Sequence, residues 1–81
     1  MHITVRLFAR LRELTGAGEL TRDLPDGSTA QDVWNALAQE YPPLAEYTKA
    51  VAVAVNEDYS RLTATVKDGD EVAFLPPVSG G

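Results

Sequence analysis

Residues 28–43 read Ser28-Thr29-Ala30-Gln31-Asp32-Val33-Trp34-Asn35-Ala36-Leu37-Ala38-Gln39-Glu40-Tyr41-Pro42-Pro43, and their pattern predicts one amphipathic helix. Ser28 and Gln31 have the spacing of a capping box, so we expect the helix to begin near Thr29. The Pro42-Pro43 pair should end it, because proline cannot continue a helical hydrogen-bond ladder. Its apolar residues form one stripe at helical spacing, namely Ala30, Val33, Trp34, Leu37, Ala38 and Tyr41. A lone helix with such a stripe must lie across a sheet.

The segments before this helix have the period of two that is typical of strands with one buried face. Residues 2–8 alternate apolar and polar side chains, and residues 20–24 repeat the pattern after the glycines at 16 and 18. We expect these two strands to form a hairpin, with residues 9–15 in the connection.

The segments after the helix predict two or three more strands. Residues 51–55 form one apolar strand, and the Asp68-Gly69 turn starts the last strand at residue 71. Residues 59–66 are compatible with a short strand and a bend, and residues 43–50 have no clear period. The predicted class is α+β, with one main helix on one face of a four- or five-stranded sheet. The ubiquitin-like β-grasp is one such fold, and its sheet is mixed because the first and last strands pair in its centre.

Size and composition limit the function. The 81 residues form one small domain, which we place at residues 1–75, followed by a flexible tail at residues 76–81. Without cysteine the chain has no disulfide, thiolate nucleophile or zinc–thiolate site. A net charge of -5 argues against nucleic acid as a partner. Arginines interrupt the N-terminal region and no apolar run is long enough to span a bilayer, so we expect a cytoplasmic protein with no membrane partner.

The tail carries the most distinctive chemistry. It reads Pro76-Pro77-Val78-Ser79-Gly80-Gly81 and spans at most roughly 20 Å when extended. A terminal carboxylate is an anion at neutral pH and a poor acyl donor, so Gly81 needs activation. Attack of that carboxylate on the α-phosphate of ATP would give an acyl adenylate, from which a sulfur or amine nucleophile could displace AMP. Glycine leaves the carbonyl unhindered for this purpose. A plain disordered tail is the competing interpretation.

The residues from Asp68 to Gly81 resemble the C-terminal region of the small, sulfur-carrying subunits of molybdopterin synthase, and Phe8-Ala9-Arg10-Leu11-Arg12-Glu13-Leu14 resembles the segment after their first strand. The resemblance implies that a ubiquitin-activating-like enzyme uses ATP to adenylate Gly81, which becomes a thiocarboxylate with sulfur from a donor protein. It further implies that the tail inserts into a large subunit, which supplies the catalytic side chains. Large and small subunits together would form a heterotetramer. There the sulfur converts a pterin precursor into the dithiolene of molybdopterin, and no cofactor is bound permanently.

The alternation of the strands predicts where a partner docks. Phe8 and Leu75 lie on the opposite parity from the buried residues of their strands, so both should face away from the helix. We expect them to form an apolar partner-binding patch with Tyr59, although a small second core under a loop is the alternative. Arg12 could pair with a partner or steady the tail, or be an ordinary solvated arginine.

The acidic turn at Asp68, Asp70 and Glu71 is not expected to be catalytic or to bind metal, because it has no histidine nearby. We expect its carboxylates to contact basic residues of the activating enzyme. Three other functions remain open. These are a sulfur carrier for thiamine thiazole synthesis, a ubiquitin-like modifier of lysines, and an interaction module that binds without covalent chemistry.

Overall fold

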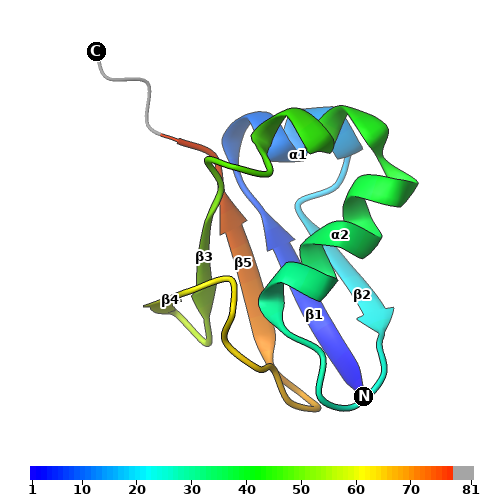
Figure 1. The fold of residues 1–81 in the computed structure, drawn as a ribbon. Helices are drawn as coiled ribbons and strands as arrows, with labels where there is room; N and C mark the ends of the chain where they lie inside the picture. The colour runs from blue at the N-terminus through cyan, green and yellow to red at the C-terminus, as the bar shows by residue number, and fades with distance from the viewer. Residues whose placement is uncertain (78–81) are drawn as a thin grey trace.

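A computed structural model of the chain describes residues 1–77 (Figure 1). The predicted tail residues Val78, Ser79, Gly80 and Gly81 lie outside the described residues. The elements in chain order are β1 His2–Leu7, α1 Ala9–Thr15, β2 Glu19–Asp23, α2 Ala30–Glu40, the 3-10 helix η1 Pro42–Tyr47, β3 Ala52–Val55, β4 Asp58–Ser60 and β5 Glu71–Leu75.

The five strands form one mixed sheet in the order β2-β1-β5-β3-β4. The first and last strands lie side by side in parallel, with Val5 opposite Val72 and Leu7 opposite Phe74, while the other three pairings are antiparallel. Since α2 crosses one face of this sheet (Figure 1), the arrangement is the ubiquitin-like β-grasp that the sequence predicts. Both the central parallel pair and the mixed sheet are confirmed.

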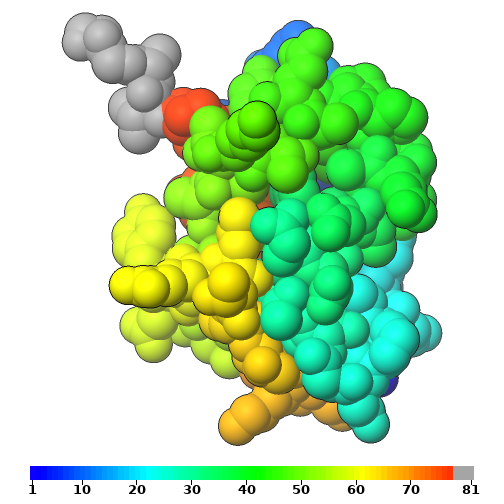
Figure 2. Space-filling view, in the orientation of Figure 1, coloured from blue at the N-terminus to red at the C-terminus, as the bar shows by residue number. Residues whose placement is uncertain are grey.

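The core lies between α2 and the sheet. Four residues of the predicted stripe, Ala30, Val33, Trp34 and Leu37, are buried, and Ala38 and Tyr41 pack partly buried against them. The Trp34 ring lies 5.1 Å from the Phe74 ring, and its indole N–H donates to Thr48 Oγ1 at 2.9 Å, which satisfies the one polar atom of this buried side chain. The space-filling view shows α2 and η1 covering this face, with the β3–β4 hairpin projecting beside them (Figure 2).

The predicted start of α2 near Thr29 is confirmed, but the predicted capping box of Ser28 and Gln31 was wrong by one residue. Thr29 is the N-cap: its hydroxyl accepts from the Asp32 N–H at 3.2 Å, and Asp32 accepts from the Thr29 N–H at 2.9 Å. Ser28 donates its hydroxyl to the Pro25 carbonyl at 2.7 Å instead, because it still belongs to the preceding turn. A carboxylate at the third helical position also suits the positive end of the helix dipole, which the amide of Gln31 would not exploit.

Two short helices were not predicted. The strands β1 and β2 do pair as an antiparallel unit, but α1 occupies the connection between them and ends at Gly16, whose φ of 75° is left-handed. Pro42 and Pro43 end α2 as expected, yet they also begin η1, because their fixed φ suits the first turn of a helix. Within residues 1–77, no helix has the length and apolar character needed to cross a membrane.

Candidate functional site

One row of side chains crosses the sheet face that α2 leaves open. The strand register places Arg6 of β1 opposite Ala73 of β5, Ala73 opposite Ala54 of β3, and Ala54 opposite Tyr59 of β4. Two methyl side chains therefore lie between two long ones. The consequence is a hollow whose floor is formed by the two alanines and whose sides are formed by Arg6 and Tyr59.

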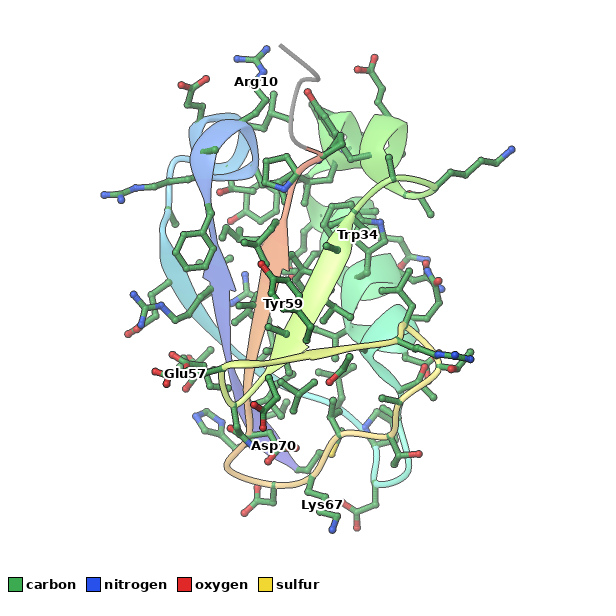
Figure 3. The ribbon with its side chains drawn as sticks, turned by 90° about the vertical axis from the view of Figure 1, so that its left-hand side faces the viewer. Arg10, Trp34, Glu57, Tyr59, Lys67 and Asp70 are labelled. Atoms are coloured by element: carbon green, nitrogen blue, oxygen red, sulfur yellow. The ribbon has the colours of Figure 1, made fainter. Side chains whose placement is uncertain are left out.

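The rows on either side close this hollow into a groove of about 250 Å³. Phe8 and Leu75 form one edge, at the end of the sheet where β1 and β5 finish. Glu57 and Glu71 form the other edge. Figure 3 looks onto this side of the molecule, where Tyr59 lies in front of the central strands and Glu57 lies to one side of them.

The apolar edge is unusually accessible for its residue types. Among residues 1–77, the large hydrophobic side chains that are exposed are Phe8 at 39% and Tyr59 at 79%, and both line the groove. Leu75 is half-buried beside them. Since Leu75 is also the last residue of β5, and Pro76 and Pro77 follow it outside the sheet, the chain leaves the fold at the edge of the groove.

Two of the charged side chains of the groove pair with each other, and the third does not. Arg6 Nη1 donates to Glu71 Oε1 at 3.2 Å, and the Arg6 guanidinium lies 5.7 Å from the centre of the Phe8 ring. Arg6 is thus held by a carboxylate and an aromatic face. Glu57 takes part in none of the ion pairs found within residues 1–77.

Glu57 is placed by a tight hairpin turn. Asn56 and Glu57 are the two residues between the paired Val55 and Asp58, with φ of 50° and 73°. Positive φ at both central positions is the signature of a type I′ turn, where glycine is preferred at the second. The Asn56 amide donates to Asp70 at 3.0 Å, and its carbonyl accepts from the Glu71 N–H at 2.9 Å. These bonds fasten the turn to the start of β5, so the backbone at Glu57 is held in place by its neighbours.

The structure brings Phe8, Tyr59 and Leu75 into one groove, and Arg12 is not among the residues that line it. Arg12 lies on α1, where its side chain passes over Gly18: a Cβ at Gly18 would be 3.2 Å from Arg12 Nε. It lines a second hollow on the β2 side of Phe8. The sequence analysis missed Arg6, Ala54, Ala73 and Glu57 as groove residues. The parity argument applied to Phe8 would have found Arg6, whereas the register that aligns the two alanines is a tertiary property.

The acidic turn has structural partners. Asp68 accepts from the His2 N–H at 2.6 Å, and Asp70 accepts from the Lys67 N–H at 2.8 Å as well as from Asn56. Across residues 1–77, no group of three or more histidine or acidic side chains is placed to hold a metal ion. Asp68 and Asp70 therefore connect this turn to β1 and to the neighbouring hairpin, whereas the Glu71 carboxylate pairs with Arg6 and is the one of the three that lines the groove.

Comparisons with known proteins show which family the chain resembles. The model of the ThiS family matches residues 5–81. A molybdopterin synthase sulfur carrier subunit from Arabidopsis thaliana is 46% identical over 81 residues, covering 100% of this chain and 84% of the relative. SAMP1, the small archaeal modifier protein 1 of Haloferax volcanii, superimposes with a TM-score of 0.83 at 28% identity, covering 100% of both chains.

A further solved structure is a complex. It contains subunits 1 and 2 of the molybdopterin-converting factor from Helicobacter pylori, and the matching chain has a TM-score of 0.69 at 28% identity with 100% of both chains covered. The family match extends over almost the whole sequence and includes the final glycines, and the relatives are similar to this chain from end to end. The chain therefore belongs to the ThiS family.

Proposed function

We propose that this protein is the sulfur carrier subunit of a molybdopterin synthase and that Gly81 is its reactive residue. The observation that carries the proposal is the combination of the final Gly80-Gly81 pair with full-length similarity to a relative of that name. The groove supports it, because a carrier that is not an enzyme on its own needs a docking surface beside the point where the tail leaves the fold.

The chemistry takes place on the main chain. A carboxylate oxygen of Gly81 attacks the α-phosphate of ATP in an activating enzyme of the ubiquitin-activating type, and pyrophosphate leaves. Hydrosulfide then attacks the acyl carbon and AMP leaves, so that one oxygen of the carboxylate has been replaced by sulfur. Where a donor protein delivers the sulfur as a persulfide, an acyl disulfide forms first, and a thiol then reduces its S–S bond to release the thiocarboxylate. In the synthase, this thiocarboxylate gives its sulfur to a pterin precursor, and water restores the carboxylate. The large subunit supplies the side chains that catalyse the transfer, and the cytoplasm is the proposed location.

The body of the carrier docks through the groove. Phe8, Tyr59 and Leu75 contribute the apolar contacts, and burying such anchors is the main source of affinity in many interfaces. Pro76 and Pro77 end the strand and direct the tail, with Val78 and Ser79, toward the partner's active site. Arg12, in its separate hollow, lies close enough to Phe8 to extend the contact. A heterotetramer with two such carriers is the proposed assembly.

Intact-mass spectrometry tests the proposal. After incubation with the activating enzyme, ATP and a sulfide source, the wild-type protein should gain about 16 Da, the difference between sulfur and oxygen. Gly81→Val should gain nothing, because the added side chain crowds the carbonyl and cannot follow glycine into a narrow channel. The circular dichroism spectrum should be the same for both proteins. A wild-type chain that never gains mass would overturn the proposal.

Attachment to other proteins is a second candidate. It is favoured by the full-length structural similarity to SAMP1 of Haloferax volcanii. The same acyl adenylate would then react with a lysine amine, and conjugates with an isopeptide at Gly81 would appear in digests of whole cells. Thiamine thiazole synthesis would use the same thiocarboxylate with another acceptor, and growth without thiamine of a strain lacking this protein would argue against it.

A further inference from the structure

We propose that Glu57 is a recognition residue of the groove, and that the partner docking there places a lysine or arginine against Glu57 beside the apolar side chain that fills the hollow. The inference rests on the proposed function in one respect, since it takes the docking partner to be the synthase large subunit. It goes beyond the proposed function because it says which kinds of side chain the large subunit must place in the groove.

The charges of the groove do not balance. Of its three charged side chains, Arg6 and Glu71 neutralise each other across 3.2 Å, and this leaves the carboxylate of Glu57 as the unbalanced charge. An apolar partner that closed over the groove would remove water from Glu57 and give nothing in return, which opposes binding. A cation on the partner converts that cost into a favourable contact, and the net charge of -5 on the carrier attracts a basic partner surface during encounter.

The backbone at Glu57 is in a left-handed conformation. A side chain at φ 73° is strained, and glycine would relieve the strain in this type I′ turn. The chain nevertheless places a carboxylate at this position, with the preceding Asn56 anchored to Asp70 and to the Glu71 N–H. A strained residue held in place by its surroundings at the edge of an apolar groove is what a preorganised contact requires.

The carboxylate of Glu57 lies opposite the apolar edge of the groove. Glu57 and Glu71 lie across the hollow from Phe8 and Leu75, and the alanine floor between them is flat and apolar. A partner segment that seats an apolar side chain over Ala54 and Ala73 would therefore have one end at Phe8 and the other at Glu57. The groove therefore favours a partner segment in which an apolar residue contacts the end near Phe8 and a basic residue contacts Glu57. This fixes the direction of the segment relative to the point where the tail leaves the fold.

Binding titrations with the purified cognate large subunit test this inference. The full-length carrier, without thiocarboxylate, is titrated calorimetrically as wild type, Glu57→Gln and Glu57→Lys. We expect Kd to rise about tenfold for Glu57→Gln and further for Glu57→Lys, because a closely paired charge is lost and then reversed. Asp26→Asn is the matched control: it removes the same charge from a side chain that is 96% exposed and outside the groove lining, and it should leave Kd unchanged.

A second variant separates recognition from turn stability. Glu57→Gly should melt at a higher temperature than the wild type, because glycine suits the left-handed backbone, while binding the large subunit as weakly as Glu57→Gln. In addition, changing one particular lysine or arginine of the large subunit to glutamate should restore binding to Glu57→Lys. Failure of every such charge swap would count against a direct ion pair and overturn the inference.

The outcomes distinguish this inference from the proposed function. If Phe8→Ala weakens binding and Glu57→Gln does not, the groove is the docking surface and the role given to Glu57 is wrong. If neither change affects binding, docking through the groove is wrong as a whole. Both results leave the gain of about 16 Da at Gly81 to be judged separately, because that mass change depends on the tail and the activating enzyme.

Discussion

Arg22 and Glu40 join strand β2 to the last turn of α2 through two hydrogen bonds. Arg22 Nε donates to Glu40 Oε2 at 2.7 Å, and Nη2 donates to Oε1 at 2.6 Å, which is the parallel fork that guanidinium and carboxylate groups favour. The hydrogen bonds from Arg22 lower the pKa of Glu40 below its usual value, and the same contact raises the pKa of Arg22. A carboxylate at the C-terminal end of a helix meets the negative end of the dipole, so Arg22 also offsets an unfavourable placement.

This pair predicts a pH dependence of stability. Because the pKa of Glu40 is lower in the folded than in the unfolded chain, its contribution is complete above the unfolded pKa and is lost as the pH falls through the folded value. Glu40 is 45% exposed, so solvent screening keeps the effect small. The melting temperature of the wild type should exceed that of Glu40→Gln by about 1–4 °C more at pH 7 than at pH 3. A difference that is the same at both pH values would contradict the assignment.

The groove shows which residues of a site can be predicted from sequence. Phe8 and Leu75 were predicted to face away from α2, because strand parity is a local property, and both line the groove with Tyr59. Glu57 could not be predicted, since its importance comes from a left-handed turn and from the pairing of Arg6 with Glu71, residues 65 positions apart. Arg12 was suggested by its place in the segment after the first strand, and the structure puts it in a neighbouring hollow that Phe8 also lines, so its role stays a prediction.

At the scale of elements, the long helix was predicted and the two short helices were not. The eleven residues of α2 carry a full apolar stripe, whereas the seven of α1 bury only Leu11 and have no side-chain cap at Phe8. Helix α1 begins at Ala9 with a φ of 49°, which no helix-start rule predicts. Its formation depends on packing against the rest of the fold, because an isolated helix of this length is not stable in water.

The alanine row is an element-scale feature with a testable role. Ala73→Leu would fill the floor of the groove from the central strand β5, because Arg6 and Ala54 leave the space above it open. We expect the large subunit to bind at least tenfold more weakly, since the partner's side chain loses its seat. The fold should melt within a few degrees of the wild type, because the change lies on the open face and leaves the core under α2 untouched.

The matched control for this change is Ala36→Leu on α2, which adds the same volume on the other side of the sheet. Both variants should be compared by calorimetric titration and thermal unfolding. Unchanged binding by Ala73→Leu would mean that the partner does not enter the hollow, whereas a large loss of melting temperature would mean that the outer face contributes to the core more than its exposure suggests.

At the scale of the whole molecule, the residues that stabilise the fold and the glycine that we propose to be reactive lie in different parts of the chain. The buried hydrophobic residues of the described part extend from Ile3 to Phe74, and the strands at its two ends, β1 and β5, pair with each other in the middle of the sheet. The fold is therefore closed by its own first and last strands. The glycine proposed to react, Gly81, follows the last strand in the sequence, so its chemistry needs no rearrangement of the core of residues 1–77.

This division predicts the behaviour of a chain that stops at Pro77. It retains every element of the sheet, the entire groove and all the buried apolar side chains of residues 1–77, so its melting temperature should lie within about 2 °C of the full-length value. It should gain no sulfur in the activation assay, because its terminal carboxylate is on Pro77 at the edge of the body. The remaining chain is too short to carry that carboxylate into the active site of the activating enzyme. Its residual binding to the large subunit should still weaken on Phe8→Ala, which reports docking of the body alone. A truncated chain that melts many degrees lower would show that residues 78–81 support the fold, and a truncated chain that accepts sulfur would remove Gly81 from the mechanism.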